Sequence, residues 1–484
     1  MFFLKQVFSH YTARILGLIS GLILIPLISF SYNAEALGLL GIQTTLLALI
    51  GLVDFGIPIA ISKEIAIGKN FAKKSQLFKA FEIPIWMISL FFLTLSLLCT
   101  PYFLDHWIKF NLISYAEMKQ CITLILISTA IRFPTSFYTN IHFGLHHHHL
   151  PNIISSSASL LRIFVSIFIA FVYKMPLEVF FTTHLIINIF ETLIFLLSFI
   201  SLRKTQSLGS YLDVYKKHYQ SLMYLTGISL LAVGLAQADK IILSRFLNLS
   251  NFGIYTAATS IASGLIVLSY PVSNAIFPSL VQSFKTNNAK KMLMYLNLGF
   301  ETTQLIIFPI AALMCMQASN IIQVLFLHKP SPYELGHILP WIAMGSLAQC
   351  LVTIPHSLQV AMGYEKRVFL INLFFLPLYI FLVFYLVKEF QIIGAAIAFL
   401  AFNISRMLAH FLCLELSSRQ RIEFLTKNIS IFIFCALLAY LLNMIHISTM
   451  LTFAKLIFSF IVISFFVFVS CSQLRLYLKK PITF

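Results

Sequence analysis

The stretch SRFLNLSNFGIYTAAT, residues 244–259, follows the pattern of SFSYNAEALGLLGIQT, residues 29–44, without a gap. A second pair lies at nearly the same offset, because FPTSFYTNIHFG (133–144) resembles IPHSLQVAMG (354–363). Two matches in the same order predict an internal duplication. The identical positions of the first pair are Ser29 and Ser244, Asn33 and Asn248, Gly38 and Gly253, and Thr44 and Thr259.

The composition places the duplicated unit in a membrane. Of 484 residues, 59% are hydrophobic and 10% are charged, and the mean hydropathy is +0.92. Soluble domains carry about 25% charged residues, and a membrane-spanning helix needs roughly 20 mostly apolar residues. The seven cysteines are scattered without a C-x-x-C pair, so they imply neither a metal site nor a disulfide framework. We expect an all-α polytopic membrane protein.

Apolar runs between polar breaks predict fourteen transmembrane helices. The N-terminal run continues to full span length without a small-residue cleavage site, so we do not expect a cleavable signal peptide. The predicted spans are 11–30, 39–61, 80–104, 118–142, 152–173, 177–201, 219–245, 253–280, 293–317, 336–361, 367–387, 391–415, 428–446 and 450–474.

The loop charges predict the orientation. With the N-terminus in the cytoplasm, 22 lysines and arginines fall on the cytoplasmic side and 8 on the outer side. Positive residues collect in cytoplasmic loops, so both termini are expected in the cytoplasm. This asymmetry also accounts for most of the net charge of +17, and no nucleic-acid partner is implied.

The repeat predicts the domain organisation. Six helices separate the two copies, and because that number is even both copies have the same orientation in the membrane. Parallel repeats of this kind are typical of transporters, with the substrate path between the two halves. We expect one six-helix lobe over residues 1–203, a second over 204–415, and two additional helices over 416–484.

Polar residues form stripes along several predicted spans. A charged side chain at a helix centre costs about 2.5–3.5 kcal/mol on insertion scales, so it should face a cavity or a partner. The stripes are Ser128, Arg132, Ser136 and Thr139; Ser155, Ser159, Arg162 and Ser166; His184, Asn188 and Glu191; and Asn403, Arg406 and His410.

Two interpretations of these stripes remain open. In the first, Arg132, Arg162 and Arg406 line a hydrated cationic cavity that binds an anionic substrate. In the second, the groups pair across helices, for example Arg132 or Arg162 with Glu191. Arg14, near the cytoplasmic end of the first span, could join the cavity or serve as an interfacial anchor.

Three residues are candidates for ion coupling. Glu191 lies near mid-membrane with His184 two helical turns away, and such a pair could titrate during transport. Asp54, in GLVDFGIP, lies nearer the cytoplasm and could instead cap or pair locally; Glu301 is a weaker candidate. The run His146–His149 lies in a short loop, where adjacent histidines rarely converge on a metal. We expect no metal and no cofactor.

Three segments resemble a known family. QADKIILSRFLNLSNFGIYTAATS (237–260) is similar to the stretch joining helices seven and eight of bacterial polysaccharide transporters, the Wzx-type O-antigen flippases, whose form is D-K-x-x-L-S-x-x-L followed by G-x-Y. LGLLGIQTTLLALIGLVDFGIPIAISKEIA (37–66) resembles their second helix and basic loop. GAAIAFLAFNISR (394–406) resembles their twelfth helix.

The resemblance implies a flippase in the superfamily of MATE exporters and lipid II flippases. Such a protein exports a polyprenyl-diphosphate-linked oligosaccharide, such as an O-antigen repeat unit, across the bacterial cytoplasmic (inner) membrane by alternating access. The implied partners are this glycolipid, membrane lipids, H⁺ or Na⁺, and other membrane proteins of polysaccharide assembly. By position, Arg132 and Arg162 match the family's cationic cavity residues.

Two other functions stay open at this stage. A MATE-like exporter of cationic drugs would need acidic cavity walls. A membrane polymerase or ligase would need a sizeable outer domain, and no long polar segment is visible. No P-loop is present, so ATP hydrolysis is not expected. Asp239 and Lys240 are expected in the outer third of the seventh span, near an outer gate, with Arg245 as an anchor at the surface.

Overall fold

The structure is a computed structural model of the chain. It describes residues 2–53, 57–67, 71–145, 147, 149–200, 203, 227, 230–231, 233–326, 333–414, 418–445, 451–471 and 474. Within these residues all regular structure is helical, apart from one isolated parallel bridge between Lys109 and Asn248. The chain divides into two compact units, Met1–Gly253 and Ile254–Phe484, hereafter unit 1 and unit 2.

The helices follow the apolar runs. In the described part of the chain, ten helices are long and apolar enough to cross a membrane, and two shorter apolar helices cover Ile15–Ser31 and Ala34–Leu49. One of the ten, Glu365–Leu412, contains two helices joined across a kink at Gln391, where φ is 48°. The prediction of an all-α polytopic membrane protein is therefore confirmed. The lobe boundaries at 203 and 415 remain a prediction.

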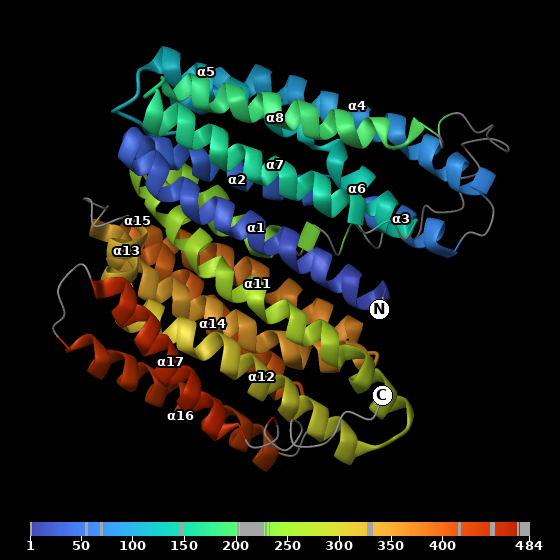
Figure 1. Ribbon diagram of the computed structural model, residues 1–484, viewed down its shortest axis with the longest axis vertical. Helices are drawn as coiled ribbons and strands as arrows, with labels where there is room; N and C mark the ends of the chain where they lie inside the picture. The colour runs from blue at the N-terminus through green and yellow to red at the C-terminus, as the bar shows by residue number, and fades with distance from the viewer. Residues whose placement is uncertain are drawn as a thin grey trace. The chain divides into compact units, whose positions relative to one another are not determined.

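Unit 1 is built from α1 to α8 and a further helical segment over residues 233–246. Helix α1 packs on α7, α7 on α8, α8 on α5 and α5 on α4, and Figure 1 shows these helices running side by side. The elements are α1 (Phe2–Ser31), α2 (Ala34–Val53), α3 (Ile57–Ile67), α4 (Phe71–His106), α5 (Tyr115–Arg132), α6 (Pro134–Gly144), α7 (His149–Ile167), the π-helical η1 (Phe168–Val172) and α8 (Leu177–Leu197).

Proline breaks one predicted span of unit 1. The span 118–142 is α5 followed by α6, with a turn at Phe133 and Pro134 at the first position of the second helix. Proline is well accommodated at a helix start but not within one, because its ring clashes with the preceding turn. The break separates Arg132, at the end of α5, from the polar residues of α6.

Two glycines allow a close helix contact in unit 1. A Cβ atom at Gly253 would lie 2.4 Å from the backbone nitrogen of Gly38, and a Cβ at Gly38 would lie 2.3 Å from the carbonyl oxygen of Leu249. Only glycine permits backbones to approach this closely. The two glycines are the matched positions of the sequence repeat, so the duplication supplies both sides of the contact.

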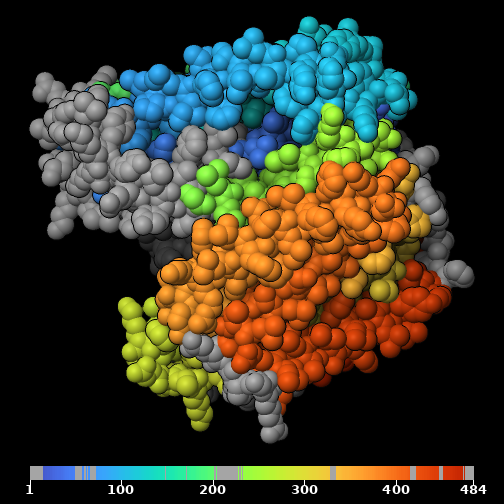
Figure 2. Space-filling view, turned by 180° about the vertical axis from the view of Figure 1, so that it is seen from behind, coloured from blue at the N-terminus to red at the C-terminus, as the bar shows by residue number. Residues whose placement is uncertain are grey.

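Unit 2 contains the remaining described helices. Helix α14 packs on α15, and α12 packs on α14, α16 and α17. Figure 2 shows α15 as a broad orange surface on one face of this unit. The elements are α11 (Leu249–Lys285, which begins in unit 1), α12 (Ala289–Met316), α13 (Ala318–Leu325), α14 (Tyr333–Ala361), α15 (Glu365–Leu412), α16 (Ser418–Asn443) and α17 (Thr452–Ser470).

Polar contacts hold the last two helices to α12. Lys427 of α16 donates to the buried carboxylate of Glu301 at 2.9 Å, and Gln304 donates to Asn428 at 2.7 Å. Gln317 donates to Ser459 of α17 at 3.3 Å. Lipid offers no alternative partner for such groups, so these contacts fix α16 and α17 in unit 2. Glu301, the weaker coupling candidate, is engaged by this ion pair.

Candidate functional site

Two arginines and one glutamate meet inside unit 1. Arg162 of α7 donates a short hydrogen bond to the Glu191 carboxylate of α8. The Nε atom of Arg132, from α5, lies 3.6 Å from the same carboxylate oxygen. The Glu191 side chain is 1% exposed, that of Arg162 10%, and that of Arg132 29%. The pairing across helices expected as one alternative is thus present, and Arg132 is the most accessible member.

Neutral polar groups extend this cluster over the same three helices. Arg162 also donates to the amide oxygen of Asn188 at 2.6 Å, and Asn188 donates to the Ser128 hydroxyl at 2.6 Å. Further along α8, the imidazole of His184 forms a hydrogen bond with the Ser166 hydroxyl of α7, at 3.0 Å. Every stripe that the sequence predicted on these helices therefore contributes a contact to one network.

A polar pocket opens beside this network. Its volume is about 330 Å³. Arg132 and Glu191 stand on one wall, and all other lining residues except one carry hydroxyl or amide groups. The lining residues are Leu47, Arg132, Thr135, Ser136, Thr139, Asn140, Ser155 and Glu191. Since two guanidinium groups face one carboxylate, the cluster carries one net positive charge. The pocket can therefore accept an anion together with groups that form hydrogen bonds.

The helix break positions part of this lining. Thr135 donates from its hydroxyl to the carbonyl oxygen of Arg132 at 2.6 Å, across the turn between α5 and α6. Asn140 donates to the carbonyl oxygen of Ser136 at 2.9 Å. Asn140 and Ser155 both line the pocket. Thr135 and Asn140 were not among the residues predicted from the sequence, although Thr135 lies three residues after Arg132 and seven after Ser128, on the face of the predicted stripe.

Arg406 lies in unit 2, on the second half of α15. Its guanidinium carbon is 5.3 Å from the centre of the Phe402 ring, an arrangement suited to a cation–π contact. Its Nε atom is buried and has no hydrogen-bond partner within the described residues. Nearby, His410 pairs with Gln359 at 2.8 Å. Arg406 therefore keeps donor capacity that the described protein does not use.

Two of the predicted site residues fall outside what the structure describes. The backbone of Arg14 lies in α1, but its side chain is outside the described part. Asp54 falls in residues 54–56, which also lie outside it. Their roles stay predictions. Of the loop histidines, His147 lies 6.2 Å, between ring centres, from His142. No group of three metal-binding side chains occurs among the described residues.

The predicted outer end of unit 1 carries a strap, defined here as residues 107–113. The indole nitrogen of Trp107 donates to the Ser244 hydroxyl at 2.9 Å, and the Arg245 guanidinium carbon lies 5.4 Å from the Trp107 ring centre. The backbone of Leu249 donates to the carbonyl oxygen of Lys109 at 2.8 Å. The charge at Arg245 thus lies over an aromatic ring of the strap.

A buried carboxylate holds the other side of the strap. Glu35, in the first turn of α2, is 2% exposed. It accepts hydrogen bonds from the backbone N–H groups of Asn111 at 2.6 Å, Leu112 at 2.9 Å and Ile113 at 3.0 Å. Sequence analysis did not find Glu35, because its partners are backbone atoms of a loop. A single acid two residues after the Asn33 cap was the available signal.

The acidic–basic pair of the helical segment 233–246, Asp239 and Lys240, precedes the strap contacts of Ser244 and Arg245 by five residues. Asp239 is 2% exposed, and Lys240 donates to the side chain of Gln237 at 3.2 Å. Lys240 thus has a partner on its own helix. A gating role for this pair stays a prediction.

Comparison with known proteins gives a consistent result. Residues 3–284 match the family described as polysaccharide biosynthesis protein. Over 163 residues the chain is 28% identical to the probable flippase AglR of Haloferax volcanii, covering 33% of this chain and about a third (34%) of that relative. Among solved structures, the lipid II flippase MurJ in an inward closed conformation aligns with a TM-score of 0.71 at 15% identity, over 98% of this chain and 99% of that chain.

A multidrug resistance MATE family transporter of the MOP superfamily, in an inward-facing conformation, is also similar. It aligns with a TM-score of 0.67 at 13% identity, over 86% of this chain and 96% of that chain. At these identities, the two structural likenesses establish the fold that the chains share.

Proposed function

Because the chain belongs to the polysaccharide biosynthesis protein family, we propose that it is a flippase. Its cargo is a polyprenyl-diphosphate-linked oligosaccharide, such as an O-antigen or related repeat unit, moved from the cytoplasmic to the outer leaflet by alternating access. The observation that carries this proposal is the polar pocket with its hydroxyl- and amide-rich lining, beside a cluster of two guanidinium groups and one carboxylate that carries one net positive charge.

The pocket chemistry suits the head of such a lipid. A diphosphate cannot cross hydrocarbon without compensation of its charge, whereas a polyprenyl tail can remain in lipid. Arg132 is the partly exposed cation of the pocket. One guanidinium group can donate two parallel hydrogen bonds to two oxygens of a phosphate. The hydroxyl and amide groups of Ser136, Thr139, Asn140 and Ser155 can form hydrogen bonds with sugar hydroxyls. Arg162, Arg406 and Arg14 are proposed as further anion-binding groups.

We propose that a proton is coupled through Glu191. The carboxylate and an incoming phosphate compete for the same guanidinium of Arg132. Protonation of Glu191 removes this competitor and leaves two net positive charges for the substrate. Binding of substrate and binding of a proton then favour each other, as reciprocal linkage requires. His184, in contact with Ser166, and Asp54 are the other candidates for this coupling.

The strap is proposed as a closed outer gate. Residues 244–249 belong to the second lobe in the predicted repeat, and the strap links them to Glu35 of the first. An outward-facing state has to separate these segments. From the positive-inside pattern we propose that the strap lies on the outer side and that both termini lie in the cytoplasm. The bacterial inner membrane is the location that the family resemblance implies, and it is proposed on that ground.

The MATE-like alternative is supported by the fold alone. An exporter of cationic drugs needs a site that attracts cations, whereas the cluster of Arg132, Arg162 and Glu191 beside the pocket carries one net positive charge. Both candidates predict a transporter without enzymatic turnover. The two are separated by their cargo.

Purified protein in vesicles tests the proposal directly. We expect translocation of a polyprenyl-diphosphate oligosaccharide, measured by its accessibility to an added glycosidase, and a loss of at least tenfold for Arg132→Glu. The matched control is Lys119→Glu, a charge reversal at the exposed start of the same helix. Translocation by Arg132→Glu at the unaltered rate contradicts the pocket assignment. Gradient-driven efflux of ethidium without glycolipid movement contradicts the flippase and supports the MATE-like exporter.

A further inference from the structure

A second, separate groove lies on the lipid-facing side of unit 1. It has a volume of about 520 Å³ and shares no lining residue with the polar pocket. Helix α4 forms one wall and the end of α8 the other. Most of its lining is apolar, and its two charged groups stand at one end. The lining residues are Glu82, Ile83, Trp86, Met87, Leu90, Leu196 and Arg203.

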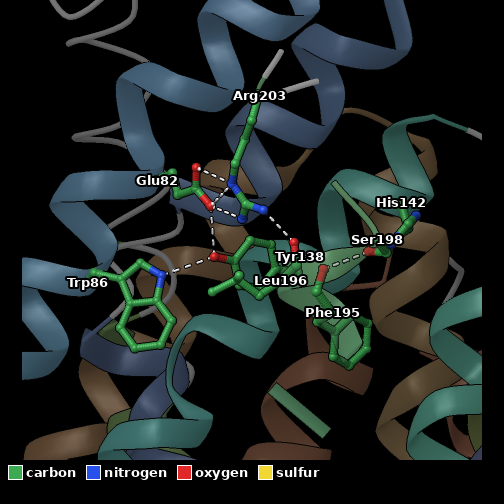
Figure 3. Close-up of polar contacts among 8 residues, drawn as sticks. All are labelled: Glu82, Trp86, Tyr138, His142, Phe195, Leu196, Ser198 and Arg203. Carbon is green, nitrogen blue, oxygen red and sulfur yellow. Dashed lines mark hydrogen bonds and ion pairs between the residues drawn. The ribbon is translucent and has the colours of Figure 1, made fainter. Parts of the chain in front are cut away.

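The charged end is a connected network, drawn in Figure 3. Arg203 binds Glu82 through Nε, at 3.0 and 3.2 Å from the two carboxylate oxygens, and through one terminal nitrogen. Its other terminal nitrogen donates to the carbonyl oxygen of Leu196. Tyr138 donates to Glu82 at 2.9 Å and accepts from the indole of Trp86 at 3.0 Å.

This network leaves both a donor and an acceptor for a ligand. A guanidinium group has five N–H bonds. Within the described part of the chain, the hydrogen bonds of Arg203 to Glu82 and Leu196 use three of them, and its guanidinium also interacts with the Tyr138 hydroxyl. Among the described residues, the Oε2 atom of Glu82 receives one hydrogen bond, the long one from Nε. The side chains are partly exposed, at 27% for Arg203 and 14% for Glu82. The pair is neutral overall, so it complements a ligand that carries one negative and one positive group.

The apolar part of the groove faces the hydrocarbon. Ile83, Met87 and Leu90 lie along one face of α4 and are 64%, 65% and 61% exposed. Figure 2 shows α4 as part of the blue surface of unit 1. The predicted topology places the start of α4, and therefore Glu82, near the cytoplasmic leaflet. An acyl chain can follow this stripe while its headgroup stays at the charged end.

We propose that this groove binds a phospholipid of the cytoplasmic leaflet whose headgroup carries a phosphate and a primary ammonium, that is, a phosphatidylethanolamine. The free N–H groups of Arg203 receive the phosphate, and Oε2 of Glu82 receives the ammonium. A choline headgroup has no N–H to donate to the carboxylate, and a purely anionic headgroup would meet the Glu82 charge. One acyl chain lies against Ile83, Met87 and Leu90.

Tryptophan quenching tests the site, because Trp86 lines the groove. The chain has three tryptophans, so the variant Trp107→Phe/Trp341→Phe reports Trp86 alone. This variant is reconstituted in phosphatidylcholine vesicles with increasing brominated lipid. We expect half-maximal quenching at an about five-fold lower mole fraction for brominated phosphatidylethanolamine than for brominated phosphatidylcholine. A preference of about five-fold in binding is what one partly exposed ionic contact can supply.

Matched variants separate headgroup recognition from general lipid contact. A Trp107→Phe/Trp86→Phe protein reports Trp341, which is 40% exposed in unit 2, and should show no difference between the two lipids. Adding Glu82→Gln to the Trp86 reporter should remove the difference while quenching by phosphatidylcholine persists. Adding Leu98→Phe, on the same helix outside the groove, should change nothing.

Two outcomes overturn the proposal. Equal quenching of Trp86 by the two zwitterionic lipids in the protein with an intact groove shows that the headgroup is not recognised. Stronger quenching by brominated phosphatidylglycerol than by phosphatidylethanolamine shows a site for anionic lipid instead. Neither outcome depends on the folding of the Glu82→Gln variant or on the transported substrate.

Discussion

Replacement of Glu35 by glutamine should loosen the strap. The Glu35 carboxylate accepts three backbone hydrogen bonds, from Asn111, Leu112 and Ile113. A glutamine side chain can keep its oxygen on Leu112 and Ile113, but its amide group then faces the Asn111 donor. At least one charge-assisted hydrogen bond is lost, worth ~1.5–3 kcal/mol. This cost corresponds to about a 10- to 100-fold larger population of molecules with an open strap.

Hydrogen exchange measures this population. With the protein in lipid nanodiscs, the amides of residues 111–113 should exchange about 10- to 100-fold faster in Glu35→Gln than in the unaltered protein. Glu117→Gln, which makes the same chemical change in the first turn of α5, is the control and should leave these amides protected. If Glu35→Gln leaves exchange at 111–113 unchanged, the carboxylate does not hold the strap, and its role in an outer gate fails with it.

Two further changes test the packing of unit 1. Gly253→Ala should destabilise the fold by an overpacking cost of ~1–3 kcal/mol and so lower the melting temperature in detergent, because the new Cβ would lie 2.4 Å from the Gly38 nitrogen. The control is Gly17→Ala, where nothing lies within 4 Å of the new Cβ, and its melting temperature should not fall. Equal melting temperatures for the two variants would contradict the close contact. Arg162→Leu and Glu191→Leu should each lower the free energy of unfolding by about 3–5 kcal/mol, because each single change leaves a buried charge unpaired. The double variant should lose less than the sum of the two single losses. Additive losses would argue against direct pairing of Arg162 with Glu191.

Much of the fold was predictable because the hydropathy signal is long and continuous. The family resemblance is confirmed by the match over residues 3–284. Predicted boundaries failed where polar residues continue a helix or where proline divides one. Helix α4 begins at Phe71, nine residues before the predicted start, since Lys73 and Lys74 are good helix formers in an aqueous loop. The predicted span 118–142 is divided at Pro134.

The candidate site was predictable only in its helical part. Spacings of three and four residues place Arg132, Arg162 and Glu191 on consistent helix faces, and the structure brings the three together. Glu35 and the pair of Glu82 and Arg203 were missed. Their contacts join residues that are 76 and 121 positions apart in the chain, the first between a carboxylate and backbone groups and the second between two side chains. No local pattern encodes such contacts.

The two arginines of the cluster are not equivalent in the proposed cycle. Arg162 already binds both Glu191 and Asn188, and its side chain is 10% exposed. Arg132 makes the longer contact, at 3.6 Å, and is 29% exposed. A phosphate can therefore displace Glu191 from Arg132 at a lower cost than from Arg162. In the proposed cycle, therefore, Arg132 is the group that meets the cargo, while Arg162 positions the carboxylate whose protonation would decide how strongly Arg132 binds the cargo.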